Sequence, residues 1–176
     1  MLDCCCPGKP SETTASRCPS SGSTGVAVDL WTVKALLTET ALRRLSVADH
    51  RFCPDPACDV VYFDGAGTSF ATGDLRVAVW QKQLFGSRPI CYCFGESEAS
   101  IQAELEKQGY SLAVERVRKH IAGGRCACEV RNPRGACCLG DLTAAVKRVE
   151  AALNERLKAR IESEDMHAGE SCTGHR

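Results

Sequence analysis

Three close-set cysteine groups constrain this chain more than any other feature: Cys91-Tyr-Cys93, Cys126-Ala-Cys128 and Cys137-Cys138. In an extended segment, residues two apart point to the same side, so Cys91 and Cys93 can present both sulfurs to one metal ion. The spacer over residues 94–125 is long enough for two short helices. Iron prefers soft sulfur ligands, and two thiolate groups separated in this way are typical of iron–sulfur clusters.

The cysteine content also bears on the redox compartment. The chain has 13 cysteines in 176 residues, an odd number, and closely spaced cysteines seldom reach relaxed disulfide geometry. The N-terminus has no basic and apolar signal-peptide pattern, and no run approaches the ~18 apolar residues of a membrane span. We therefore expect reduced thiols in a cytoplasmic protein without a membrane segment.

Charge and motif content argue against several classes of function. The 22 basic and 22 acidic side chains balance, so there is no global electrostatic reason to expect nucleic acid or anionic lipid as a partner. The sequence contains no combination of nucleophile, base and orienting group, and no glycine-rich phosphate loop. We expect a binding or electron-transfer protein and not an enzyme.

The chain divides by composition into five parts. Residues 1–25 are rich in Ser, Thr, Gly and Pro and predict a flexible arm that carries cysteines 4, 5 and 6. Residues 26–88 predict a small α/β domain with a helix beginning near Thr32 and strands at 26–30, 50–53, 60–63, 69–72 and 75–80. Cys18, in the arm, would contribute to this domain.

The C-terminal half is predicted to be mainly helical. Within residues 89–140, one helix begins at Ser97 and ends at Gly109, and another begins at Ser111 and ends at residues 123–124. Asp141 caps a long helix over residues 141–163, packed on its own chain or on a second copy. A flexible tail follows over residues 164–176. The fold class is α+β, with a small α/β module, a helical cluster unit and a long C-terminal helix.

The choice of ligands in the second half has alternatives. Four thiols, those of Cys126, Cys128, Cys137 and Cys138, compete to complete a site begun by the first cysteine pair. Adjacent residues in an extended chain diverge, so one member of each pair is expected to be a spare. Zinc could use the same ligands, although Cys-x-Cys with a long spacer is not the Cys-x2-4-Cys knuckle that zinc sites favour.

A family resemblance extends this interpretation. The segments Phe52-Cys-Pro-Asp-Pro-Ala-Cys58, Cys91-Tyr-Cys93-Phe, Asn132-Pro-Arg-Gly135 and Cys137-Cys-Leu-Gly140 resemble the N-terminal domain of the CopZ copper chaperone family over roughly residues 18–140. The resemblance implies a zinc-binding α/β module joined to a two-iron, two-sulfur (2Fe-2S) unit similar to bacterioferritin-associated ferredoxin. The implied cluster ligands are Cys91, Cys93, Cys128 and Cys138, and the implied zinc ligands are Cys18, Cys53 and Cys58.

The chain departs from the family pattern at two points. Where the family has a Cys-Pro-x-Cys-Gly knuckle, this chain reads Cys18-Pro-Ser-Ser21-Gly22, and a serine hydroxyl is a poor zinc ligand. His50 or an N-terminal cysteine could replace it, or the site could hold no zinc. The chain also lacks a Met-x-Cys-x-x-Cys copper-binding domain. Soft ligands for Cu(I) would then come from cysteines 4–6 or from Met166, His167, Cys172 and His175.

These observations lead to one functional hypothesis and two alternatives. The resemblance implies an iron–sulfur redox protein that handles copper or another soft metal, and that supplies single electrons to reduce Cu(II) to Cu(I). Its partners would be a copper-transporting ATPase or a separate copper chaperone. The alternatives are a ferredoxin-like electron carrier and a zinc-stabilised interaction module without a redox role.

Overall fold

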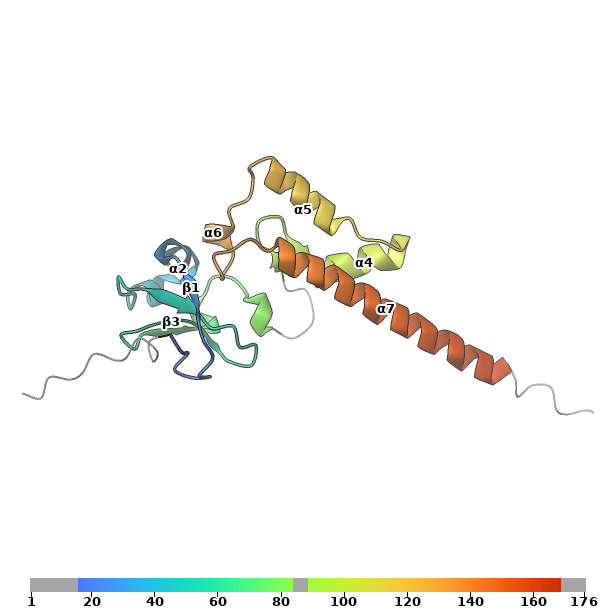
Figure 1. Cartoon of the computed structure of the whole chain (residues 1–176), viewed down its shortest axis with the longest axis horizontal. Helices are drawn as coiled ribbons and strands as arrows, with labels where there is room; N and C mark the ends of the chain where they lie inside the picture. Colours follow the sequence, from blue (N-terminus) through green and yellow to red (C-terminus); the bar gives the residue numbers. More distant parts are fainter. Residues whose placement is uncertain (1–15, 84–88, 169–176) are drawn as a thin grey trace, which may run out of the picture.

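The computed structural model describes residues 16–83 and 89–168. Figure 1 shows a small sheet module at one end of the molecule and a helical unit at the other, from which a long C-terminal helix extends. The sheet has four strands in the order β1-β2-β3-β4, with each strand antiparallel to the next. The strands are β1 (Val26–Val28), β2 (His50–Phe52), β3 (Val60–Asp64) and β4 (Ser69–Ala71).

The two faces of the sheet bury different groups. Phe52 and Tyr62 are cross-strand partners, and both pack into the main core of the module with Phe70. Because side chains alternate along a strand, Phe63 lies on the opposite face, where it packs with three buried cysteines. The sheet therefore has a hydrophobic core on one side and a thiol cluster on the other.

Helices α2 (Leu30–Leu36) and α3 (Glu39–Leu42) follow the first strand. The predicted start of α2 near Thr32 is wrong, because Asp29 is the N-cap and its carboxylate accepts the N–H of Trp31 at 2.8 Å. The predicted strand at 75–80 is also absent from the described residues. That stretch lies between two 3₁₀ turns, η1 (Thr72–Asp74) and η2 (Trp80–Lys82), and Leu75 forms only an isolated bridge with Leu37.

The helical unit begins with the short hairpin of β5 (Pro89–Cys91) and β6 (Glu96–Ser97). Helix α4 (Glu98–Gln108) is capped by Ser97 and ends at Gly109, which has a φ of 79°, and both boundaries confirm the prediction. Helix α5 (Ala113–Ala122) starts two residues after the predicted Ser111, whose hydroxyl accepts the N–H of Ala113. A short helix, α6 (Cys128–Arg131), follows.

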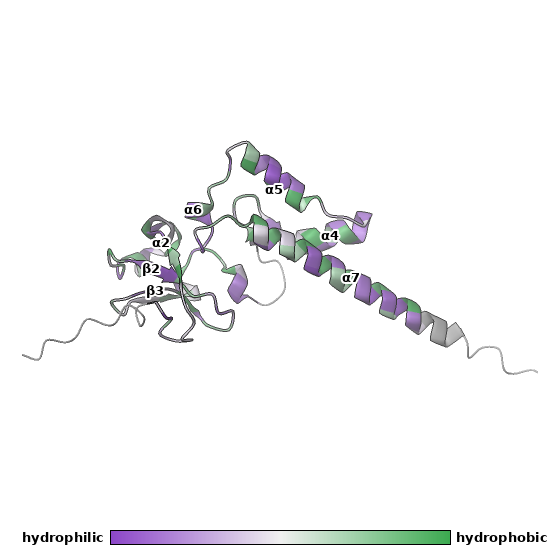
Figure 2. Cartoon of the chain, viewed as in Figure 1, coloured by the Kyte–Doolittle hydropathy of each residue, from purple (hydrophilic) through white to green (hydrophobic). Residues whose placement is uncertain are grey.

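The C-terminal helix α7 (Leu139–Ala168) is longer than predicted at both ends. Asp141 lies in its first turn and not at its N-cap, and residues 164–168 are helical where a tail was expected. Its buried residues Leu142, Ala145, Val146 and Val149 pack on α4 and α5. Farther along the helix, Leu157 and Ile161 are exposed, at 50% and 59%. Figure 2 shows that apolar residues continue along α7 past the end of its contact with α4.

Hydrogen bonds join the sheet module to the helical unit. The hydroxyl of Tyr62, in β3, donates to the backbone carbonyl of Pro133 at 2.8 Å in a buried position. The Thr32 hydroxyl, in α2, donates to the carbonyl of Glu129, and α2 and α6 lie in contact. The loop that carries the second cysteine groups is thus held against the first module.

The prediction of a flexible arm is wrong for residues 16–25. Ser16 to Gly25 are part of the sheet module: the N–H of Gly25 donates to the carbonyl of Ser16, and Arg17 bridges Thr24. The remainder of the predicted arm, residues 1–15, lies outside the described residues. The same holds for the predicted Cu(I) ligands Cys172 and His175 and for the side chains of Met166 and His167. None of the helices in the described ranges has the length and apolar character needed to cross a membrane.

Candidate metal centres

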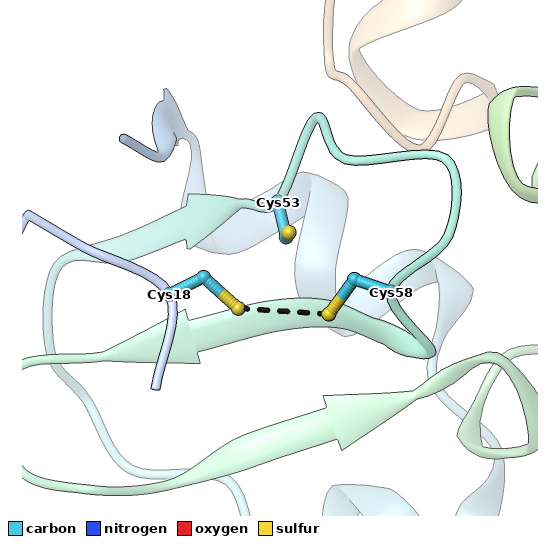
Figure 3. Close-up of side chains that lie close together, drawn as sticks. All are labelled: Cys18, Cys53 and Cys58. Atoms are coloured by element: carbon cyan, nitrogen blue, oxygen red, sulfur yellow. Dashed lines mark hydrogen bonds between the residues drawn. The ribbon is translucent and has the colours of Figure 1, made fainter. Parts of the chain in front are cut away.

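The first candidate centre consists of Cys18, Cys53 and Cys58, whose sulfur atoms all lie within 4.8 Å of one another. The Cys18 and Cys58 sulfurs are 3.8 Å apart, and Figure 3 shows the three side chains converging from separate segments. All three are buried. The structure therefore brings together the three residues predicted as zinc ligands.

Local turns place these thiols. Cys18 begins a turn in which the N–H of Gly22 donates to its carbonyl at 2.9 Å, and Gly22 has a φ of 71° that favours glycine. Cys53 follows β2, and its N–H donates to the carbonyl of Val61. Cys58 lies in the loop before β3, and its N–H donates to the carbonyl of Asp55 at 3.3 Å.

The surroundings of this centre favour a thiolate at Cys18 and oppose one at Cys53. Burial opposes ionisation of Cys18, but hydrogen bonds from the backbone and hydroxyl of Ser21 and from the backbone of Ser20 lower its pKa to about 7. Burial raises the pKa of Cys53, and the nearby Lys82 ammonium opposes that rise. Lys82 is fixed by hydrogen bonds to the carbonyls of Asp55 and Cys58, at 2.9 and 2.8 Å. No motif in the sequence pointed to Lys82.

The distance between the Cys18 and Cys58 sulfurs fits a tetrahedral zinc ion. A Zn–S bond of about 2.3 Å at the tetrahedral angle separates two sulfurs by about 3.8 Å, which matches the pair formed by Cys18 and Cys58. The predicted replacement ligand His50 does not join them. Its Nδ1 lies 2.8 Å from the carbonyl of Ala48 and its ring faces Phe70, because strand alternation directs it to the opposite side from Cys53.

The second candidate centre joins cysteines from both ends of the helical hairpin. The Cys93 and Cys128 sulfurs are 3.8 Å apart, although 35 residues separate them in the sequence. The thiols of Cys91 and Cys138 lie close enough to perturb each other's ionisation, and both side chains are buried in the same cluster. Each member of the Cys-x-Cys pair therefore contacts a later thiol, and the four predicted cluster ligands lie in one region.

The spare thiols differ in their positions. Cys137 is exposed while Cys138 is buried. Cys126 is half-buried, and its sulfur lies 3.2 Å from that of Cys128. Cys93, Cys126 and Cys128 together form a group within 4.8 Å. Five thiols therefore surround this centre where the prediction had four.

Turns and helix ends position the second group. Cys91 ends β5, and its carbonyl accepts the N–H of Gly95 at 2.8 Å in a turn where Gly95 has a φ of 74°. The N–H of Ala127 donates to the Cys93 sulfur at 3.4 Å. Cys138 directly precedes α7, and its carbonyl accepts the N–H of Leu142. Backbone donors thus contact the sulfurs that a metal would share.

Protonation in this group is uneven. The hydrogen bond from Cys138, helped by the N–H groups of Phe94 and Cys93, lowers the pKa of Cys91 to about 6 against the effect of burial. The same hydrogen bond raises the pKa of Cys138. Burial raises the pKa of Cys93 and of Cys128. Metal binding at this centre must therefore release protons.

Three comparisons with known proteins agree on one family. Residues 15–76 match a family model described as the CopZ zinc binding domain. The copper chaperone CopZ of Archaeoglobus fulgidus is 34% identical over 148 residues, covering 78% of this chain and 70% of the relative. The chain belongs to the CopZ family. The X-ray structure of the A. fulgidus CopZ N-terminal domain matches it with a TM-score of 0.60 and 33% identity.

The structural match covers more of this CopZ-family protein than the zinc-domain match does. It covers 73% of this chain and 95% of the A. fulgidus domain, whereas the zinc-domain match covers only the centre formed by Cys18, Cys53 and Cys58. Sequence spacing found both thiol groups. It left open which of the later thiols Cys93 would meet, because a contact that closes over the 94–125 hairpin has no local signal.

Proposed function

We propose that this protein handles copper, that it binds zinc in the sheet module and that it holds a 2Fe-2S cluster in the helical unit. The observation that carries the proposal is the convergence of Cys91 and Cys93 with Cys128 and Cys138 across the helical hairpin. Membership of the family of a copper chaperone supports the choice of cargo. We infer a metal carrier that acts by binding and electron transfer and not by catalysis.

The donor set at the second centre fits an iron–sulfur cluster. Four thiolates are the ligands that 2Fe-2S clusters require, and the four cysteines implied by the family resemblance are in contact as two pairs. The N–H of Ala127 on the Cys93 sulfur is the kind of hydrogen bond that tunes such a cluster. A bound cluster would supply one-electron chemistry, which is what reduction of Cu(II) to Cu(I) needs.

The first centre suits zinc in a supporting role. Its three sulfurs are buried beneath the sheet, and the segments that carry them come from the start of the module and from both sides of the β2–β3 connection. A metal held there would crosslink these segments and stabilise the fold. We infer that zinc is resident at this centre and that copper, or another soft metal ion, is the cargo.

The partners follow from the cargo. A carrier of Cu(I) delivers to a copper-transporting ATPase or to a separate copper chaperone, both of which would receive the ion on thiolates. In the described residues, the half-buried Cys126 and the exposed Cys137 are the thiols beside the second centre that the four cluster ligands leave over. They offer soft ligands to an arriving ion.

The test of the cluster is its colour and composition. Protein purified without oxygen should be brown and contain iron and acid-labile sulfide in equal amounts, and Cys91→Ser should lose both. Cys137→Ser is the matched control, because the exposed Cys137 should be replaceable without loss of the cluster. A colourless protein that contains only zinc would refute the redox proposal and leave an interaction module.

The test of the cargo is a titration with Cu(I) under a competing chelator. Tight binding by the parent protein that weakens in Cys126→Ser or Cys137→Ser would support copper handling. A brown protein with no tight Cu(I) binding would instead be a ferredoxin-like electron carrier. The basic side chains available to dock such a carrier are partly neutralised, since Arg116 pairs with Glu96 and Arg134 pairs with Asp141.

A further inference from the structure

The first candidate centre contains a serine hydroxyl where a tetrahedral site needs a fourth ligand. Ser21 Oγ lies 3.4 Å from the Cys53 sulfur and also hydrogen-bonds the Cys18 thiol. For a zinc ion with Zn–S near 2.3 Å and Zn–O near 2.0 Å, the tetrahedral angle separates oxygen and sulfur by about 3.5 Å. The hydroxyl therefore lies at a distance from Cys53 that suits the fourth corner of a site whose other corners are thiols.

Solvent reaches this centre from the side of Ser21. The three cysteines are 2%, 0% and 7% exposed, whereas Ser21 is half-buried and its neighbours Ser20 and Gly22 are exposed. On the other side, Phe63 and Val60 pack against the sulfurs, and Lys82 holds the loop that carries Cys58. A small molecule that approaches the metal position would arrive where the hydroxyl lies.

Of the four groups, the Ser21 hydroxyl would bind a metal ion most weakly. Thiolates are charged, soft ligands, whereas an alcohol is neutral and hard and stays protonated. Zinc sites with three protein ligands keep a fourth position for water or another exchangeable group, in contrast to closed four-thiolate sites. A chain with cysteine at position 21 would close the site, and Ser21 leaves it open.

We propose that the metal at Cys18, Cys53 and Cys58 has an exchangeable fourth position that binds a small thiol in place of the Ser21 hydroxyl. The thiol loses its proton to solvent and binds as a thiolate, and the neutral hydroxyl leaves with its own proton, so no electrons are transferred. This inference rests on the proposed metal binding of the sheet module. It adds that the module is a thiol-accepting metal site and not a closed structural one.

Cobalt(II) in place of zinc reports the number of thiolates through its sulfur-to-cobalt charge-transfer absorption. The full chain is loaded with cobalt(II), and the spectrum of an identically treated Cys53→Ala protein is subtracted to remove signals from the other cysteines. Adding 2-mercaptoethanol should raise the remaining absorption by about one third, the change from three Co–S bonds to four. Ser21→Ala should respond in the same way, because it keeps the open corner.

Ser21→Cys is the decisive variant. It should begin at the intensity of four thiolates and show no response to 2-mercaptoethanol, and its zinc dissociation constant should be about 10- to 100-fold lower than that of the parent. The Ser21→Ala protein keeps the test valid even if Ser21→Cys folds poorly.

Two results would overturn the inference, and they differ in what else they refute. If 2-mercaptoethanol raised the absorption of Ser21→Ala but not that of the parent protein, the hydroxyl would close the site. The proposed zinc binding would then stand. A cobalt spectrum unchanged by Cys53→Ala would mean that no metal binds there, which would refute both the inference and the proposed role of the module.

Discussion

Replacing Gly135 with alanine tests how the segment that carries the second thiol group is held. Gly135 has a φ of 65°, and its N–H donates to the carbonyl of Asn132 at 2.7 Å in a turn between α6 and α7. A Cβ at this position would lie 2.9 Å from the Thr32 hydroxyl oxygen and 3.3 Å from a methyl group of Val28. The substitution therefore strains both the turn and its contact with α2.

The two effects can be added. A left-handed conformation costs a non-glycine residue about 1–2 kcal/mol. Displacing the Thr32 hydroxyl from its bond to the carbonyl of Glu129 costs a further ~0.5–1.5 kcal/mol. We expect Gly135→Ala to reduce the free energy of unfolding by about 1.5–3.5 kcal/mol, a large part of the 5–15 kcal/mol typical of a folded domain.

Gly140 provides the matched control. It lies in the first turn of α7, and a Cβ there would meet nothing within 4 Å. Since alanine is favoured over glycine inside a helix, Gly140→Ala should be neutral or stabilise by up to ~1 kcal/mol. The two variants are thus expected to change stability in opposite directions or by clearly different amounts.

The assay is urea unfolding of the parent and both variants at one metal loading, because a bound metal adds to the apparent stability. A lower midpoint for Gly135→Ala with an unchanged slope would be a change in stability. Equal midpoints for Gly135→Ala and the parent would refute the argument that this turn is strained by a side chain and held against α2.

Two further predictions concern the sheet module. Tyr62→Phe leaves the buried carbonyl of Pro133 without its hydrogen-bond donor and should lower the free energy of unfolding by about 1–3 kcal/mol. The control Tyr110→Phe, at an exposed position, should change the free energy of unfolding by less than ~0.5 kcal/mol. Equal urea midpoints for the two variants would contradict this prediction. Burial opposes ionisation of Asp64, but hydrogen bonds from Ser46 and the following turn hold its pKa below the ordinary 3.8. The contribution of the Asp64 carboxylate to the free energy of unfolding is therefore complete above pH 3.8 and is lost as the pH falls through the lower pKa of the folded state. The urea midpoint of the parent should fall more steeply than that of Asp64→Asn between about pH 5 and pH 3. Parallel curves for the two proteins would show that Asp64 contributes nothing.

Local features of the sequence were enough to predict much of the fold. The strands at 50–53 and 60–63 follow from runs of apolar and β-branched residues around a proline turn, and helix α4 follows from its serine cap and glycine end. These signals act within a few residues. The convergence of the cysteines could also be anticipated, because residues predicted to share a metal ion must meet wherever they lie in the chain.

Features that depend on distant partners could not be predicted. Thr32 was interpreted as a helix cap because its residue type suits one, but in the structure its hydroxyl donates to Glu129, 97 residues away. Residues 75–80 have the composition of a strand, yet among the described residues they form no strand, and Leu75 and Val79 are buried in the core of the module. Residue type gave the tendency to be buried in both cases, and the tertiary contacts decided the conformation.

The same long-range contacts suggest why one chain carries both centres. Cys128 and Cys138 lie at the two ends of a segment that has only the four-residue helix α6 as regular structure, and so short a helix has little stability of its own. The contacts that fix the segment come from the sheet module, through Tyr62 on Pro133, Thr32 on Glu129 and the close approach of Gly135 to α2. Since the module in turn closes over Cys18, Cys53 and Cys58, metal bound at the first centre would stabilise the surface on which the ligands of the second are presented.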